Sequence, residues 1–307
     1  MNIFINMHRI SIPQFFTIIF VTLAWAACFP LIELGHRAAP PLKFAAIRSL
    51  MAGLSIVLPL LFLKRLRILD LSLWKGSFFI AITYTVLGFG GMFLADGRVP
   101  SGIATVLTNT QPLITAVLAY FFLSEKLNKR SILGLSISFL GILFIASQSF
   151  SINSLSSSFI GFLFILLGAF GTGAGNVFMK KLVLRHDPLT LTGLQYIIGS
   201  IILFPLSYFV ETHAPINWHP SFFWSLVILA IPGTAMATVF WIYLLKKIDL
   251  VKLNMFTFLT PAFGLIIGHL LFNEKYFYND VLGIILILVG ILLAFLNSKR
   301  MKPEYLQ

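Results

Sequence analysis

Ten apolar stretches follow one another along the chain and leave little sequence between them. A helix that crosses a hydrocarbon core of about 30 Å needs roughly 20 residues. The predicted spans cover residues 15–35, 44–63, 76–95, 102–123, 131–149, 159–179, 189–210, 221–245, 251–272 and 280–297. Of the 307 residues, 58% are hydrophobic and 10% are charged, so a soluble domain of this composition would expose its core to water. We therefore expect an all-α integral membrane protein with ten transmembrane helices.

The 22 basic residues are distributed unevenly between the two sides of the membrane. With the N-terminus inside, only Arg37, Lys43, Arg98 and Lys275 fall outside, and Arg48 lies within a span. The positive-inside rule then places both termini in the cytoplasm, and we expect the membrane to be the plasma (inner) membrane. This bias also accounts for the formal net charge of +12, so we expect no nucleic-acid partner.

The two halves of the chain repeat each other. At an offset of 149, residues 107–146 align with 256–295, and the identical pairs include Thr108/Thr257, Pro112/Pro261, Glu125/Glu274, Lys126/Lys275, Gly134/Gly283 and Gly141/Gly290. Five spans per half is an odd number, so the second half has the opposite orientation. We predict two inverted five-helix repeats, at 13–148 and 159–297, joined by an external linker at 149–158. Inverted repeats are typical of secondary transporters, with the site near the midplane between the halves.

Several motifs carry a resemblance to a known family. They are a Trp-containing first span (LAWAACFPLIEL), an early Arg in the second span (FAAIRSLMAG), Pro112 in the fourth span, SEKL after it, and Gly134 and Gly141 beyond. From about residue 13 to 297 the sequence resembles the EamA family of the drug/metabolite transporter superfamily. The resemblance implies a ten-helix permease, most often engaged in efflux. The chain departs from the family pattern after Trp25, where Ala26, Ala27 and Cys28 replace the usual Gly and Asn.

Polar residues surround the prolines in the middle of spans four and nine. A proline removes a backbone hydrogen bond, and the freed carbonyl must be satisfied or face a cavity. On one reading, the nearby Thr hydroxyls only satisfy these carbonyls and join helices. On the other, the two broken helices face each other across a substrate cavity, lined by Thr108, Asn109, Gln111, Thr257 and Thr260.

Arg48 lies about one and a half turns inside the second span, where a charge needs a partner or an aqueous route. Glu33 and Asp96 are at comparable depth. We predict an ion pair between Arg48 and one of these carboxylates near the outer face, with an anion or carboxylate contact as the alternative.

Aromatic and amide side chains add three further candidates for substrate contact. Trp25, Tyr84, Trp241 and Tyr243 lie inside or near span ends, where interfacial aromatic belts form, but Trp25 and Tyr84 are deep enough to line a cavity. Asn176 follows a run of small residues at 171–175 that lets helices approach closely. It either bonds a neighbouring helix or contacts substrate. The glycine pairs Gly134/Gly141 and Gly283/Gly290 are interpreted as packing positions.

These features favour a secondary transporter of small polar or amphipathic metabolites, amino-acid-like or drug-like, working by alternating access as an exporter. A flippase for a lipid or lipid-linked sugar shares the fold and stays open. A membrane-embedded lipid-modifying enzyme would need clustered Asp, Glu or His, and the sequence offers neither a catalytic nor a metal constellation.

The expected partners are a small-molecule substrate and membrane lipid. We expect no cofactor, because no nucleotide-binding motif is present. Transport is then driven by the substrate gradient or by protons coupled through Glu33 or Asp96. Association as a homodimer is left open.

Overall fold

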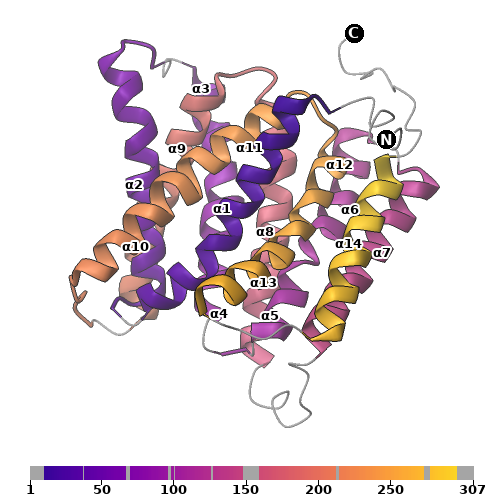
Figure 1. The fold of residues 1–307 in the computed structure, drawn as a ribbon. Helices are drawn as coiled ribbons and strands as arrows, with labels where there is room; N and C mark the ends of the chain where they lie inside the picture. Colours follow the sequence, from indigo (N-terminus) through magenta and orange to yellow (C-terminus); the bar gives the residue numbers. More distant parts are fainter. Residues whose placement is uncertain are drawn as a thin grey trace.

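The computed structural model describes residues 10–36, 38–66, 70–95, 98–99, 101–125, 127–147, 159–211, 214–272 and 277–295 (Figure 1). Within these ranges the chain is helical and contains no β-strand. The described residues form ten helical spans that are long and apolar enough to cross a membrane. The predicted all-α, ten-helix architecture is confirmed.

The first repeat contains five spans. They are formed by α1 (Ile12–His36), α2 (Pro41–Phe62), a third span made of α3 (Leu71–Ile80), the π-helical η2 (Ala81–Phe89) and α4 (Gly90–Ala95), a broken fourth span made of α5 (Ser101–Thr108) and α6 (Gln111–Leu123), and α7 (Lys129–Ala146).

The second repeat reproduces this pattern of whole and interrupted helices. It comprises α8 (Phe159–Leu182), α9 (Pro188–Val210), a third span made of α10 (Pro220–Ala230), the π-helical η5 (Ile231–Met236) and α11 (Ala237–Leu245), a fourth span made of α12 (Leu250–Met255), the 3₁₀ turn η6 (Phe256–Phe258) and α13 (Leu259–Phe272), and α14 (Tyr278–Phe295). A π segment therefore interrupts the third span of both repeats, and a break interrupts the fourth.

The packing of the helices follows an approximate twofold relation between the repeats. The second spans pack together as α2 and α9, and the fifth spans as α7 and α14. The third span of the first repeat packs on α8, and its counterpart in the second repeat packs on α1. In Figure 1, α7 and α14 lie side by side at one edge of the bundle. This exchange of equivalent contacts is what two inverted copies require.

Glycines bring α7 and α14 into backbone contact, as predicted from their spacing. A Cβ added to Gly134 would lie 2.5 Å from the carbonyl oxygen of Gly290, and one added to Gly141 would lie 2.6 Å from that of Gly283. No side chain fits there, because the obstacle is backbone. Such close approach lets transmembrane helices associate through dispersion contacts.

The breaks predicted at the two prolines are present. α5 ends at Thr108, and Pro112 is the second residue of α6. In the second repeat the helix tightens into η6, and Pro261 is the third residue of α13. A proline has no N–H to donate to the carbonyl four residues earlier, so the preceding turn loses its regular hydrogen bond.

Most of the described basic residues lie at one end of the bundle, which we call the basic end. There α3, α7, α9 and α12 begin, and α2, α6, α8 and α11 end (Figure 1, top). The basic residues at this end are Lys64, Arg65, Lys75, Lys129, Arg130, Lys180, Lys181, Arg185, Lys246, Lys247 and Lys252. At the opposite end the described ranges hold only Lys43 and Arg98.

Local caps define where several helices start at the basic end. Asp70 accepts from the amide of Ser72, and Asn128 from that of Ser131. Each side chain satisfies an amide that its helix leaves unpaired in the first turn. These caps are local, since donor and acceptor are two or three residues apart.

Candidate functional site

Arg48 lies at the interface between the two repeats. Its side chain is 5% exposed, and Nε donates a hydrogen bond of 2.8 Å to the hydroxyl of Thr234. Nη2 lies 3.7 Å from the sulfur of Cys28, and the guanidinium carbon lies 4.7 Å from the ring centroid of Phe89. A cation over an aromatic face is stabilised by the ring quadrupole. Span two of the first repeat thus meets span three of the second through a buried cation.

The predicted partners of this cation lie outside the described residues, since neither Asp96 nor the side chain of Glu33 is among them. Within the described part of the chain, the polar partners of Arg48 are Thr234 and Cys28, and neither is a carboxylate. A buried charge is costly unless it is paired. The predicted ion pair of Arg48 with Glu33 or Asp96 therefore stays a prediction.

The hydrogen bond from Arg48 to Thr234 has a counterpart related by the repeat. Gln195 stands in α9 where Arg48 stands in α2, each seven positions after the proline that opens its helix. Thr85 and Thr234 are likewise equivalent, each fourteen positions after the start of its span. Thr85 donates to Oε1 of Gln195 over 2.7 Å. Each π segment thus presents a threonine to the second span of the other repeat.

Two tyrosines extend the polar cluster. The hydroxyls of Tyr196 and Thr238 are 2.6 Å apart, and Tyr84 interacts with the same threonine. The ring of Phe89 packs between the tyrosines, 5.8 Å from Tyr84 and 6.0 Å from Tyr196 between centroids. Tyr84 is buried, so it does not belong to an interfacial belt.

Asn176 and two tryptophans form the neighbouring part of the cluster. The indole Nε1 of Trp241 donates to Oδ1 of Asn176 over 2.9 Å, and the ring centroids of Trp25 and Trp241 are 4.9 Å apart. The structure therefore shows the helix-to-helix bond that was one of the two alternatives for Asn176. Trp241 has no exposed surface, so its assignment to an aromatic belt is wrong. Its burial is tolerated because the indole N–H finds an amide partner on α8.

The small residues before Asn176 connect this cluster to span four. A Cβ on Gly175 would lie 2.6 Å from the Cβ of Tyr84, and one on Gly173 would lie 3.0 Å from the hydroxyl of Thr115. The close approach predicted for this run is present, toward η2 and α6.

The residues around the two prolines also meet across the repeats. Nε2 of Gln111 donates to Oδ1 of Asn254 over 3.0 Å, which joins α6 to α12. The Thr257 hydroxyl donates to the carbonyl of Asn254, as expected for a threonine that satisfies a broken helix. The remaining predicted residues lie close to these breaks, with Asn109 buried and Thr108 and Thr260 half-buried.

Spans four and nine pack together near the basic end and separate toward the opposite end. α6 packs against α12, whereas α5 and α13 share little contact among the described residues. Gly264 lies in α13 beyond the break, and a Cβ added there would meet no atom within 4 Å. Open space therefore lies beside span nine on the side away from the basic end.

Five residues of the cluster were missed by sequence reasoning: Thr85, Gln195, Tyr196, Thr234 and Thr238. A signal for two of them was present, since the repeat places Gln195 opposite Arg48 and aligns Thr234 with Thr85. Thr85 and Thr234 align at the offset of 149, whereas Arg48 and Gln195 align only when each second helix is counted from its own start.

The sequence profile of the EamA-like transporter family matches residues 13–147 and 159–296. The chain belongs to this family. The predicted resemblance is thereby confirmed, and the EamA profile matches once in each half, which fits the two-repeat architecture. The protein is an integral membrane transporter.

Similar EamA relatives cover nearly the whole chain. The uncharacterized transporter YoaV of Bacillus subtilis is 28% identical over 286 residues, which are 93% of this chain and 97% of YoaV. A protein of Salmonella typhimurium named "Probable amino-acid metabolite efflux pump" is 24% identical over 90% of this chain and 92% of its own. A solved crystal structure superimposes with a TM-score of 0.77 at 16% identity, covering 92% of this chain and 96% of that one. This last likeness shows the fold alone.

Proposed function

We propose that this EamA protein is a secondary transporter that exports small polar or amphipathic metabolites by alternating access. The observation that carries the proposal is the buried guanidinium of Arg48, held between the repeats by Thr234. A cation beside aromatic rings and hydroxyls suits a small molecule with a carboxylate and an apolar part. Amino-acid-like metabolites have this chemistry, and the name of the Salmonella relative supports the choice.

The proposed site combines the residues predicted from the sequence with the cluster seen in the structure. Arg48 would bind the carboxylate, and Trp25, Tyr84 and Asn176 would border the substrate. The second group of site residues lies around the broken helices: Thr108, Asn109, Gln111, Thr257 and Thr260. The glycine run of α8 approaches Tyr84 of the first group and Thr115 of α6, the helix that carries Gln111 of the second.

Direction, location and energy source also belong to this proposal. The distribution of basic residues supports an orientation with the basic end and both termini in the cytoplasm, and we propose the plasma (inner) membrane as the location. Proton coupling through Glu33 or Asp96 stays a prediction, as do the repeat boundaries 13–148 and 159–297.

The test is transport by the purified protein in liposomes. Pooled amino acids, nucleotides and amphipathic drugs are screened for accumulation, with and without a pH gradient. We expect uptake of carboxylate-bearing compounds that Arg48→Gln abolishes while the variant stays monodisperse. Uptake of uncharged compounds only, unchanged in Arg48→Gln, would contradict the proposed site.

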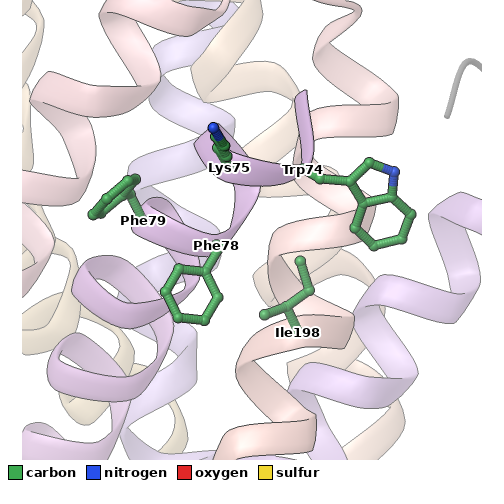
Figure 2. A pocket seen from close by; sticks show the side chains of 5 residues that line it. All are labelled: Trp74, Lys75, Phe78, Phe79 and Ile198. Carbon is green, nitrogen blue, oxygen red and sulfur yellow. The ribbon is translucent and has the colours of Figure 1, made fainter. Parts of the chain in front are cut away.

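A lipid flippase is the second candidate, and a groove on the lipid-facing surface favours it. The groove lies between α3 and α9 near the basic end, and its lining is almost wholly apolar. Figure 2 shows Trp74, Phe78 and Ile198 around it, with Lys75 on the same helix turn. Such a groove could admit an acyl chain from the leaflet at that end. Accelerated bilayer exchange of fluorescent phospholipids in the same liposomes, without metabolite uptake, would favour this candidate.

A further inference from the structure

Glu125 joins the first repeat to the start of span nine in the second. It follows α6, and its two carboxylate oxygens accept hydrogen bonds from the backbone amides of Leu250 at 2.8 Å and Val251 at 3.0 Å. These amides belong to the first turn of α12, where the helix itself provides no acceptor for them. Unlike the local caps at this end, Glu125 reaches a helix 125 positions away in the other repeat.

Lys180 holds the same connection from its other side. It lies in the last turn of α8 with 6% of its surface exposed. Its ammonium donates to the carbonyl of Ile248 at 2.6 Å and to that of Leu245, where α11 ends. Burying an ammonium group is costly, so the two carbonyl contacts are needed to keep it there.

The two side chains carry opposite charges and act on one short segment. Residues 246–249 connect α11 to α12. Lys180 bonds the carbonyls of Leu245, just before this segment, and of Ile248 within it, and Glu125 bonds the two amides that follow it. Lys180 and Asp249 are the charged groups that interact electrostatically with Glu125. The connection between spans eight and nine is therefore clamped to α6 and α8 at the basic end.

Among the described residues at its opposite end, which stop at Phe272, span nine has no cap of this kind. There α13 shares little contact with α5 among the described residues, and a Cβ added to Gly264 would meet no atom within 4 Å. A helix clamped at one end and separated from its partner at the other is arranged as a gate with one closed side.

We propose that Glu125 and Lys180 form a latch that keeps the basic end of the transport path closed in this conformation. Release of the α11–α12 connection would let span nine part from α6 at the basic end and approach α5 at the other. This inference rests on the proposed alternating access, but its test requires neither a substrate nor transport.

Hydrogen–deuterium exchange in detergent measures the latch at its own amides. We expect Glu125→Gln to raise exchange in peptides covering 246–255 by about tenfold, because a Gln side chain has one acceptor oxygen for the two backbone amides and places an NH₂ donor against the second. Lys180→Met should act in the same direction. The matched control is Lys181→Met, which removes the same charge from the adjacent, exposed position and should leave this exchange unchanged.

A second measurement separates a gate from an ordinary helix cap. The thiol introduced by Gly264→Cys is labelled with a membrane-impermeant maleimide in oriented vesicles, and the parent protein gives the background from buried Cys28. We expect labelling from the side opposite the basic end, and a fall of at least about threefold when Glu125→Gln is added, because span nine then closes at that end.

The two measurements together decide the proposal. Raised exchange at 246–255 with unchanged labelling at position 264 would reduce Glu125 to a structural cap and overturn the latch. Unchanged exchange in both Glu125→Gln and Lys180→Met would overturn it as well. Failure of the liposome uptake assay alone would overturn the proposed function and leave these accessibility results standing.

Discussion

At the scale of single residues, a hydrogen bond between Gln111 and Asn254 connects the two broken spans near their prolines. Replacing Asn109 or Gln111 with an apolar residue of similar size should reduce transport severely while folded protein remains in the membrane. A lost hydrogen bond between transmembrane helices averages only about 0.6 kcal/mol of stability, whereas a lost substrate contact acts directly on affinity. Uptake in liposomes and the amount of monodisperse protein are the two measurements.

A matched control for these variants lies away from the site. Ser138 donates to the carbonyl of Ile287 between α7 and α14, so Ser138→Ala removes a comparable interhelical bond. It should leave transport intact. Normal transport by both Asn109→Leu and Gln111→Met would exclude the site residues proposed around the breaks.

Glu125 makes stability depend on pH. Its pKa lies above the usual range, chiefly because burial penalises the carboxylate, while the amides of Val251 and Leu250 and the charge of Lys180 act in the opposite direction. A carboxyl group whose pKa is higher in the folded than in the unfolded state contributes stability below the unfolded pKa, and this contribution is lost as pH rises through the folded pKa.

We therefore expect the free energy of unfolding to fall as pH rises from the ordinary Glu range through this higher pKa. Glu125→Gln is uncharged throughout and should flatten that part of the profile. Thermal unfolding of both proteins in detergent, between about pH 4 and pH 8, gives the comparison. If the free energy of unfolding of the wild type, relative to that of Glu125→Gln, rises with pH, the raised pKa of Glu125 is contradicted.

Residue chemistry could be predicted from the sequence only in part. Arg48, Tyr84 and Asn176 stand out because polar groups in apolar spans are rare. Thr234 and Trp241 do not, since threonine is common in transmembrane helices and tryptophan is expected at their ends. Their roles depend on which helix of the other repeat faces them, and the sequence does not contain that information directly.

At the scale of elements, the spans and their breaks follow from local chemistry, and η5 contains Pro232, whereas the π segment η2 has no such local signal. Apolar length predicts the helices, and Pro112 and Pro261 predict the interruptions. η2 contains no proline, and its wider turn places Thr85 against Gln195. A π turn arises from an extra residue accommodated by packing, so only the assembled bundle reveals it.

The contact between α7 and α14 gives a prediction at this scale. Gly134→Val should lower the free energy of unfolding by about 1–3 kcal/mol, because the new side chain meets the backbone carbonyl of Gly290, which cannot move aside. Gly264→Ala is the control, since a Cβ added there would meet no atom within 4 Å. Thermal unfolding in detergent compares the two variants. Equal losses of stability would show that α7 and α14 can move apart at little cost.

At the scale of the whole molecule, the ten spans place both termini on the same side of the membrane, because an even number of crossings returns the chain to the face where it started. We expect a reporter fused to the C-terminus to be active only in the cytoplasm. Reporters in the loops after α1 and α9 should give the opposite result. A C-terminus accessible from outside would contradict both the orientation and the assignment of the basic end.

The architecture was accessible from sequence because the repeat, the odd number of spans per half and the charge bias each constrain it independently. The conformation of the transport path was not accessible from the sequence. Which end of spans four and nine is closed depends on contacts such as Glu125 with α12, made between residues far apart in the chain.

The central claim is that Arg48 binds a substrate carboxylate between the repeats. The most direct test measures binding of an amino acid and of its amide to the wild type and to Arg48→Gln. Loss of either partner of a buried charge pair costs about 2–5 kcal/mol, so we predict that the carboxylate ligand loses at least about thirtyfold in affinity with the substitution. The amide should lose little. Equal losses for both ligands, or none for the carboxylate, would contradict the claim.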